Sequence, residues 1–171
     1  RLVSDARTAR PEGEHRLVSV LFAGVSGLDG IVDQLGPGHE GEIINALNRY
    51  VLGVQSAVHR YGGVINKMDL AANGEKLLAF FGAPVAHEDD AERAVRAALS
   101  IQERLEALRQ ELAGETGLMG LRLEQRVGIS YGYVFAGNIG TDWRREYTVM
   151  GDAVNLAERL LAVAEPGGMS V

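Results

Sequence analysis

Two long helical patterns with a pair of strand patterns between them constrain the fold of this chain more than any other feature. Apolar residues recur at helical spacing over residues 39–60 and again over residues 87–111. Between these patterns, residues 64–68 and 76–81 are apolar runs that flank a polar, glycine-containing connection. Such runs are typical of a hairpin with a longer loop. The sequence therefore predicts a helix, a hairpin and a second helix in succession.

Three further patterns complete the predicted order of elements. Residues 17–23 form a short β-branched and aromatic run that ends in glycine, as a buried strand followed by a turn does. Residues 122–137 alternate apolar and polar side chains around two glycines, which indicates one long bent strand or a pair of strands. A short strand over 147–150 leads into a final helix over 152–164. This order predicts an α+β domain with helices on one face of a mainly antiparallel sheet.

The composition favours a single soluble domain. The 171 residues suffice for one buried core, and the absence of cysteine excludes a disulfide framework or a thiolate nucleophile. Seventeen basic and 23 acidic residues give a net charge of -6 without a basic run, which argues against nucleic acid or an anionic membrane as the main partner. No apolar stretch approaches the ~20 residues of a membrane-spanning helix. We therefore expect a cytoplasmic protein.

The N-terminal segment differs from the rest of the chain. Residues 1–16 have mixed charge, a proline and a glycine, but no sustained apolar period. They are predicted to form a linker or arm, and the folded domain is predicted to span residues 17–171. The chain begins at Arg1 rather than Met, which is typical of a fragment of a longer protein.

Two clusters contain residue types found in ligand-binding or metal sites, but each is better explained as local structure. Residues 36–41 satisfy G-x-G-x-x-G, yet they do not follow a strand directly, as the dinucleotide-binding version must. Residues 87–90 have the side chains of a metal site. Acids at a helix start more often stabilise its exposed amides, so we expect Asp89 or Asp90 to cap the helix.

The last helix carries a more informative set of polar residues. Asp152, Asn155 and Arg159 are spaced by three and four residues, so they share one helix face. A guanidinium binds phosphoryl oxygens through two fixed donors, and a carboxamide can orient a ribose. The same spacing also fits a solvated face with Asp152 as its cap. Lys67, in an otherwise apolar strand, either extends to water or presents its ammonium to a ligand.

Six segments in order carry a resemblance to a known family. They are residues 17–27, 61–67, 81–84, 87–94, 127–140 and 145–157. Together they resemble the class III nucleotidyl cyclase catalytic domain, from residue 17 nearly to the end of the chain. The resemblance implies a ferredoxin-like α+β domain that works as a head-to-tail dimer, with active sites assembled from both partners at the interface.

This resemblance implies nucleotide-binding roles for five residues. Lys67 is similar to the lysine that reads the purine, Thr148 to the neighbouring Asp/Thr position, and Val149 to a backbone contact beside it. Asn155 is similar to the ribose-binding amide. Arg159 is similar to the arginine that stabilises the transition state when the 3′-hydroxyl attacks the α-phosphate. The Lys/Thr combination resembles the adenylate branch, which implies ATP rather than GTP as substrate.

The family's two metal-binding aspartates have no equivalent in this chain. Gly24 stands at the first position. Glu75 is the acid nearest the second, and a longer side chain followed by Lys76 is a poor substitute for an aspartate shared by two Mg²⁺ ions. The chain thus most resembles the metal-less second catalytic half of soluble adenylyl cyclases. No metal is expected on this chain alone, and Mg²⁺ or Mn²⁺ only where a partner domain supplies the aspartates.

Two functions follow from this resemblance. In the first, the chain pairs with a second cyclase domain, in tandem or as a heterodimer, and contributes to conversion of ATP to cyclic AMP in signal transduction. The reaction is that of a lyase, and a homodimer of this chain is then expected to have no cyclase activity. In the second, the chain is a pseudo-cyclase that regulates by dimerisation or senses a small ligand. The chain stops at Val171, before a further basic residue of the family, so we expect a C-terminally incomplete domain.

Overall fold

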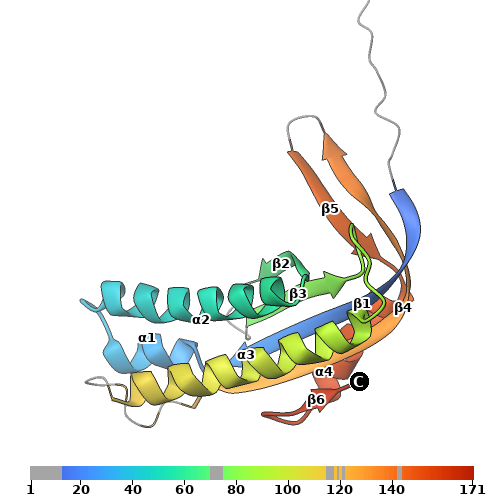
Figure 1. The fold of residues 1–171 in the computed structure, drawn as a ribbon. Helices are drawn as coiled ribbons and strands as arrows, with labels where there is room; N and C mark the ends of the chain where they lie inside the picture. The colour runs from blue at the N-terminus through green and yellow to red at the C-terminus, as the bar shows by residue number, and fades with distance from the viewer. Residues whose placement is uncertain (1–12, 70–74, 115–117, 119, 121, 142–143) are drawn as a thin grey trace, which may run out of the picture.

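The computed structural model describes residues 13–69, 75–114, 118, 120, 122–141 and 144–171. Over these residues, six strands form one sheet in the order β2-β3-β1-β4-β5, with β6 beside β4 (Figure 1). The strands are β1 Gly13–Ser26, β2 Val64–Asp69, β3 Glu75–Phe81, β4 Glu124–Thr141, β5 Arg144–Met150 and β6 Met169–Ser170, and the helices are α1 Asp29–Leu35, α2 Glu40–Arg60, α3 Asp90–Ala113 and α4 Asp152–Val163. Neighbouring strands are antiparallel except β4 and β6. The predicted α+β class is confirmed.

The sheet has an apolar core on each face. Leu21 and Phe81 belong to the core under α2 and α3, which run side by side along one face (Figure 1). Val20 and Phe80, one position away on the same strands, belong to a second core that α4 covers. We expected helices on one face only, and the placement of α4 corrects this. A strand buried on both faces has a continuous apolar run rather than an alternating one, and residues 17–23 have such a run.

Two glycines of β4 determine how closely α4 approaches the sheet. A Cβ atom on Gly128 would lie 2.2 Å from the carbonyl oxygen of Ala157 and 2.3 Å from the amide nitrogen of Leu161. At Gly132 a Cβ would lie 3.2 Å from that of Ala153. Ser130, between them, donates its hydroxyl to the carbonyl oxygen of Ala153. The two glycines therefore allow α4 to pack directly against the backbone of β4. The stretch is one long strand, which is the first of the two predicted alternatives.

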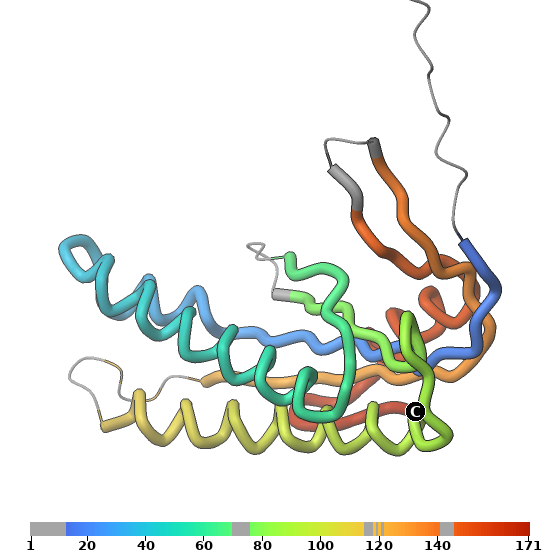
Figure 2. The backbone as a smooth tube through the Cα atoms, turned by 45° about the horizontal axis from the view of Figure 1, so that its top comes forward, coloured from blue at the N-terminus to red at the C-terminus, as the bar shows by residue number. Residues whose placement is uncertain are grey.

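The outer part of β4 and β5 form an arm that rises from the rest of the sheet. Residues 135–141 pair with residues 144–150, and the arm stands away from α2 and α3 in both views (Figures 1 and 2). The N-terminal part of β1 runs to the base of this arm, where it pairs with residues 134–137. The long strands β1 and β4 thus connect the body of the domain to the arm.

Several boundaries differ from those predicted. β1 begins at Gly13, so residues 13–16 belong to the strand and not to a linker, because they pair with β4 although their side chains are largely exposed. The short elements α1 and β6 were not predicted, since seven and two residues are too few for a periodic pattern. The two long helices and the hairpin are confirmed to within a few residues.

The side-chain cap that we expected at the start of α3 is not formed. Asp89 is the N-cap residue but makes no capping hydrogen bond. Its carboxylate instead accepts from Arg93 Nε at 2.6 Å, and this guanidinium holds the pKa of Asp89 below its usual value. The carboxylate of the buried Asp90 accepts from the backbone amide of His87 at 2.7 Å, ahead of the helix. The cluster is therefore a local structural motif.

No helix in the described part of the chain is long and apolar enough to cross a membrane.

Candidate functional site

A hollow of about 550 Å³ opens between α4 and the ends of three central strands. Its polar and charged lining comes from β1, β3, β4 and α4, namely Ser26, Lys76, Glu124, Arg126, Asn155, Glu158 and Arg159. The predicted pair Asn155 and Arg159 therefore lies together, on the exposed face of α4. Asp152 shares this face and lines an adjoining hollow with the same two residues. The spacing argument thus placed these three side chains correctly.

The packing of α4 explains why this face is available to a ligand. Ala153, Ala157 and Leu161 are buried against the sheet, which turns the polar residues outward. Among the described residues, Arg159 makes no ion pair, and the residue is exposed. An exposed cation without a carboxylate partner is free to bind an anion brought by another molecule.

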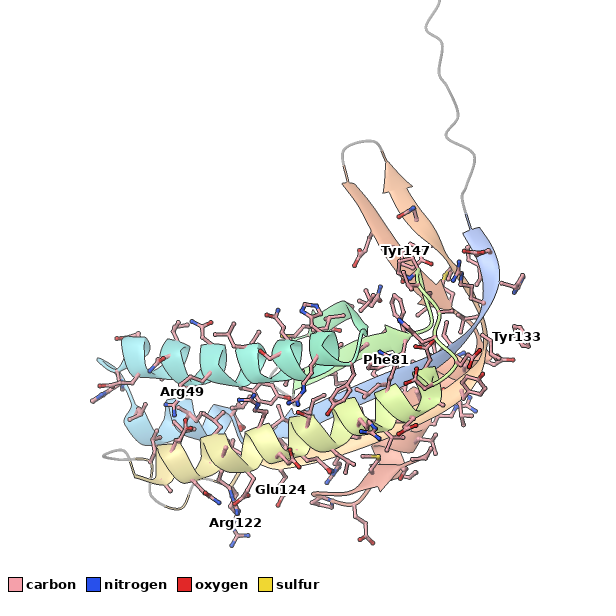
Figure 3. All side chains as sticks on the ribbon, in the orientation of Figure 1. Arg49, Phe81, Arg122, Glu124, Tyr133 and Tyr147 are labelled. Atoms are coloured by element: carbon pink, nitrogen blue, oxygen red, sulfur yellow. The ribbon has the colours of Figure 1, made fainter. Side chains whose placement is uncertain are left out.

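A second group of predicted residues lies where β2 meets the arm. Thr148 of β5 donates its hydroxyl to Asn66 Oδ1 at 3.4 Å, and Asn66 Nδ2 donates to the carbonyl oxygen of Tyr147 at 2.9 Å. The ring centroid of Tyr147, a residue of the arm that is labelled in Figure 3, also lies 6.1 Å from that of Phe80 on β3. β2 and β5 occupy opposite ends of the strand order, so the curvature of the sheet brings its two edges together.

Lys67 is next to this contact and is largely exposed. Its ammonium forms an ion pair with Asp69 at 3.0 Å, and 63% of the side chain remains accessible. The β2–β3 register shifts between Ile65 and Lys67, so Asn66 occupies a bulge and can turn toward β5. Asn66 precedes Lys67 in the chain and accepts the hydrogen bond from Thr148, so the three residues lie close together. Neither Lys67 nor Thr148 lines the hollow beside α4.

Val149, the fifth predicted residue, is only 3% exposed. Its side chain packs in the core under α4, opposite Ala136 of β4. Only its backbone is available for a ligand, which is the kind of contact that the resemblance implies for this position.

The two expected metal positions have different surroundings from a carboxylate site. Gly24 pairs in register with Lys76 on one side and Arg126 on the other. Glu75 begins β3 opposite Val25, and its side chain lies outside the described residues. No group of three or more His, Cys, Asp or Glu suited to a metal ion occurs in the described part. A glycine between two cations does not fit Mg²⁺ or Mn²⁺, which require oxygen ligands.

Sequence reasoning assigned no role to Asn66, Arg126 or Glu158. The signal at Asn66 was an amide within an apolar strand. Arg126 and Glu158 gave no local signal. The strand register places Arg126 beside Gly24, and the packing of α4 brings Glu158 to Lys76.

Residues 11–171 match a family described as the adenylate and guanylate cyclase catalytic domain. Among curated proteins, the chain is 33% identical over 162 residues to the uncharacterized protein Rv1319c and over 157 residues to the uncharacterized protein Rv1318c, both of Mycobacterium tuberculosis. These matches include 94% and 91% of this chain but 27% and 26% of the relatives. The chain thus spans about a quarter of the length of these curated relatives.

Solved cyclase structures have the same fold. The adenylyl cyclase CyaB from P. aeruginosa superposes with a TM-score of 0.79 at 29% identity, over 92% of this chain and 77% of that one. The guanylyl cyclase Cya2 gives a TM-score of 0.75 at 31% identity, over 92% and 75%. Cyclases of both types match nearly equally, so the overall similarity does not determine which base is bound.

Proposed function

Because the chain belongs to the adenylate and guanylate cyclase catalytic domain family, we propose that it is the nucleotide-binding complement of an adenylate cyclase. In this function it forms a dimer with a second cyclase domain, which carries the aspartates for Mg²⁺ or Mn²⁺. One observation carries the proposal. The face of α4 presents Asn155 and Arg159 together over a hollow, while Gly24 leaves that hollow without the family's first aspartate.

Arg159 and Asn155 supply the groups that a phosphoryl reaction requires. The Arg159 guanidinium donates to non-bridging phosphoryl oxygens, and its charge stabilises the negative charge that develops during 3′-hydroxyl attack. The Asn155 amide holds the ribose so that this hydroxyl lies in line. Both side chains are already exposed and need no rearrangement of the core to reach a nucleotide at a domain interface.

The hydrogen bonds at Asn66 support ATP over GTP. A carbonyl oxygen can only accept, so the contact with Tyr147 fixes the Asn66 amide with Nδ2 toward it. Asn66 Oδ1 then faces Thr148, whose hydroxyl must donate to it. The lone pairs that remain on the Thr148 oxygen can accept from the 6-amino group of adenine. Guanine presents a carbonyl oxygen there, which offers no hydrogen.

Lys67 completes the proposed base site. Its ammonium carries three donors and no acceptor, and the ion pair with Asp69 uses one of them. The other donors suit the ring nitrogen acceptors of a purine. Val149 contributes through its backbone, because its side chain is buried.

The experiment is complementation. The purified chain is mixed with a cyclase domain that retains both aspartates but has lost its own Asn and Arg, and cyclic AMP is measured with Mg²⁺ or Mn²⁺. We expect product only from the mixture, and a loss of at least about 100-fold with Arg159→Ala. Arg104→Ala, an exposed arginine on α3, is the matched control and should leave activity unchanged. Full activity of Arg159→Ala, or cyclic AMP from the purified chain alone, would contradict the proposal.

The cation pair around Gly24 also favours a second function, that of a catalytically inactive regulatory module. In this case the chain would dimerise with a cyclase domain without contributing to turnover. The same mixture separates the two functions. Complex formation by sedimentation with no cyclic AMP supports the regulatory module.

A further inference from the structure

Three residues form a row across the central strands at the position where the family carries its first metal ligand. Gly24 of β1 is opposite Lys76 of β3 and also opposite Arg126 of β4. Residues directly opposite one another in a sheet project from the same face. All three line the hollow beneath α4, so two cationic side chains flank a residue that has no side chain.

Arg126 has a donor without an acceptor. Its Nε atom is buried, and it has no hydrogen-bond partner among the described residues. Buried polar groups are nearly always paired, so the unpaired Nε shows that no described acceptor holds the Arg126 guanidinium through this atom, while the residue as a whole lines the hollow. Guanidinium donors pair best with the oxygens of phosphate and carboxylate groups, which they bind through two parallel hydrogen bonds.

The charges around the hollow favour an anion. Among the described residues that line the hollow, Lys76, Arg126 and Arg159 contribute three cations, and Glu124 and Glu158 contribute two carboxylates. Glu158 is already paired with Lys76, at 3.3 Å. The described lining is therefore cationic by one charge, in a chain whose net charge is -6. An anion would also compete with Glu158 for the Lys76 ammonium.

We propose that this hollow binds a phosphate-type oxyanion without a divalent metal ion, held by Arg126 and Lys76 beside Gly24. The two cations take over the neutralisation of phosphate charge that a metal ion would otherwise provide. The volume of about 550 Å³ accommodates a single phosphate or a polyphosphate chain. This inference goes beyond the proposed function, because it requires neither adenine nor a partner domain.

Calorimetric titration of the purified chain tests the proposal. Inorganic phosphate and inorganic triphosphate are used separately, in EDTA and at constant ionic strength. We expect saturable binding of one anion per chain, weakened at least tenfold by Arg126→Gln. Gly24→Asp should weaken binding as much, because a carboxylate between the two cations neutralises them. Tighter binding of triphosphate identifies a polyphosphate ligand, whereas equal affinities identify a single phosphate group.

Arg122→Gln is the matched control. Arg122 precedes β4 on the same segment, is exposed, and does not line the hollow, and its side chain points away from the domain in Figure 3. It should bind phosphate like the unaltered chain. If Arg126→Gln fails to fold by circular dichroism, Lys76→Gln replaces it, since about half of the Lys76 side chain is exposed.

Three results would overturn the proposal. They are no saturable binding, binding that requires Mg²⁺, and equal affinity in the chain and in the folded variants at Arg126 or Lys76. None of these bears on the complementation assay, which depends on Arg159 and a partner. The two proposals can therefore fail separately.

Discussion

The two walls of the hollow differ in what they offer a nucleotide. The wall formed by α4 presents Asn155 and Arg159, an amide and a guanidinium suited to ribose and phosphate. The wall formed by the sheet presents Gly24 between Lys76 and Arg126, where the family has carboxylates for metal. One wall thus presents the groups that the proposed nucleotide site requires, and the other presents two cations on either side of a glycine.

The two walls differ because they are built from different kinds of elements. The polar residues of α4 lie on an exposed helix face, where they contribute little to the core. The residues of the sheet wall come from three strands, and the register places each beside the next. A change at Gly24 would therefore alter the environment of both Lys76 and Arg126.

The largest effect is expected when the α4 wall is displaced from the sheet wall. In Gly128→Ala the new Cβ would overlap backbone atoms of Ala157 and Leu161, which cannot move without shifting the helix. We expect a loss of about 2–3 kcal/mol in the free energy of unfolding, measured with urea. Gly132→Ala is the control, since its Cβ would meet only the Ala153 side chain and should cost less than about 1 kcal/mol. Equal stability of the two variants would contradict the close packing of α4 against Gly128.

Much of the fold could be predicted because it depends on local patterns. The apolar stripes of α2 and α3 and the spacing of Asn155 and Arg159 lie within single elements. The face that α4 covers, and the start of β1 at Gly13, depend on contacts between distant segments. These contacts leave no periodic signal in the sequence.

The candidate site also has one part that the sequence could predict and one part that it could not. The α4 wall could be predicted from one helix, whereas the sheet wall required the register of three strands. Lys76 and Arg126 are 50 residues apart in the chain, and only the register places them on either side of Gly24. Asn66 likewise reaches Thr148 only because the sheet curves. Residue types alone could indicate a lost carboxylate but not the cations that flank its position.

A smaller effect is expected at the base site, which extends the retained chemistry beyond the hollow. In Asn66→Ala the Thr148 hydroxyl loses its fixed acceptor and can donate to guanine as well as accept from adenine. We expect the preference for ATP over GTP in the complemented pair to fall roughly tenfold. Asn48→Ala, an exposed asparagine on α2, should leave the preference unchanged. An unaltered preference in Asn66→Ala would remove the argument that Asn66 orients this hydroxyl.

The smallest effect concerns an ion pair that joins the two walls. Glu158 of α4 holds Lys76 of β3 at 3.3 Å, and about half of each side chain is exposed. Glu158→Gln should therefore change the free energy of unfolding by less than about 1 kcal/mol. It also frees the ammonium for phosphate, so the affinity in EDTA should rise about threefold, since a competing carboxylate is removed. Glu106→Gln breaks a comparable exposed pair with Arg109 on α3 and should leave phosphate affinity unchanged. A lower phosphate affinity in Glu158→Gln would mean that Glu158 positions Lys76 for the anion rather than competing with it.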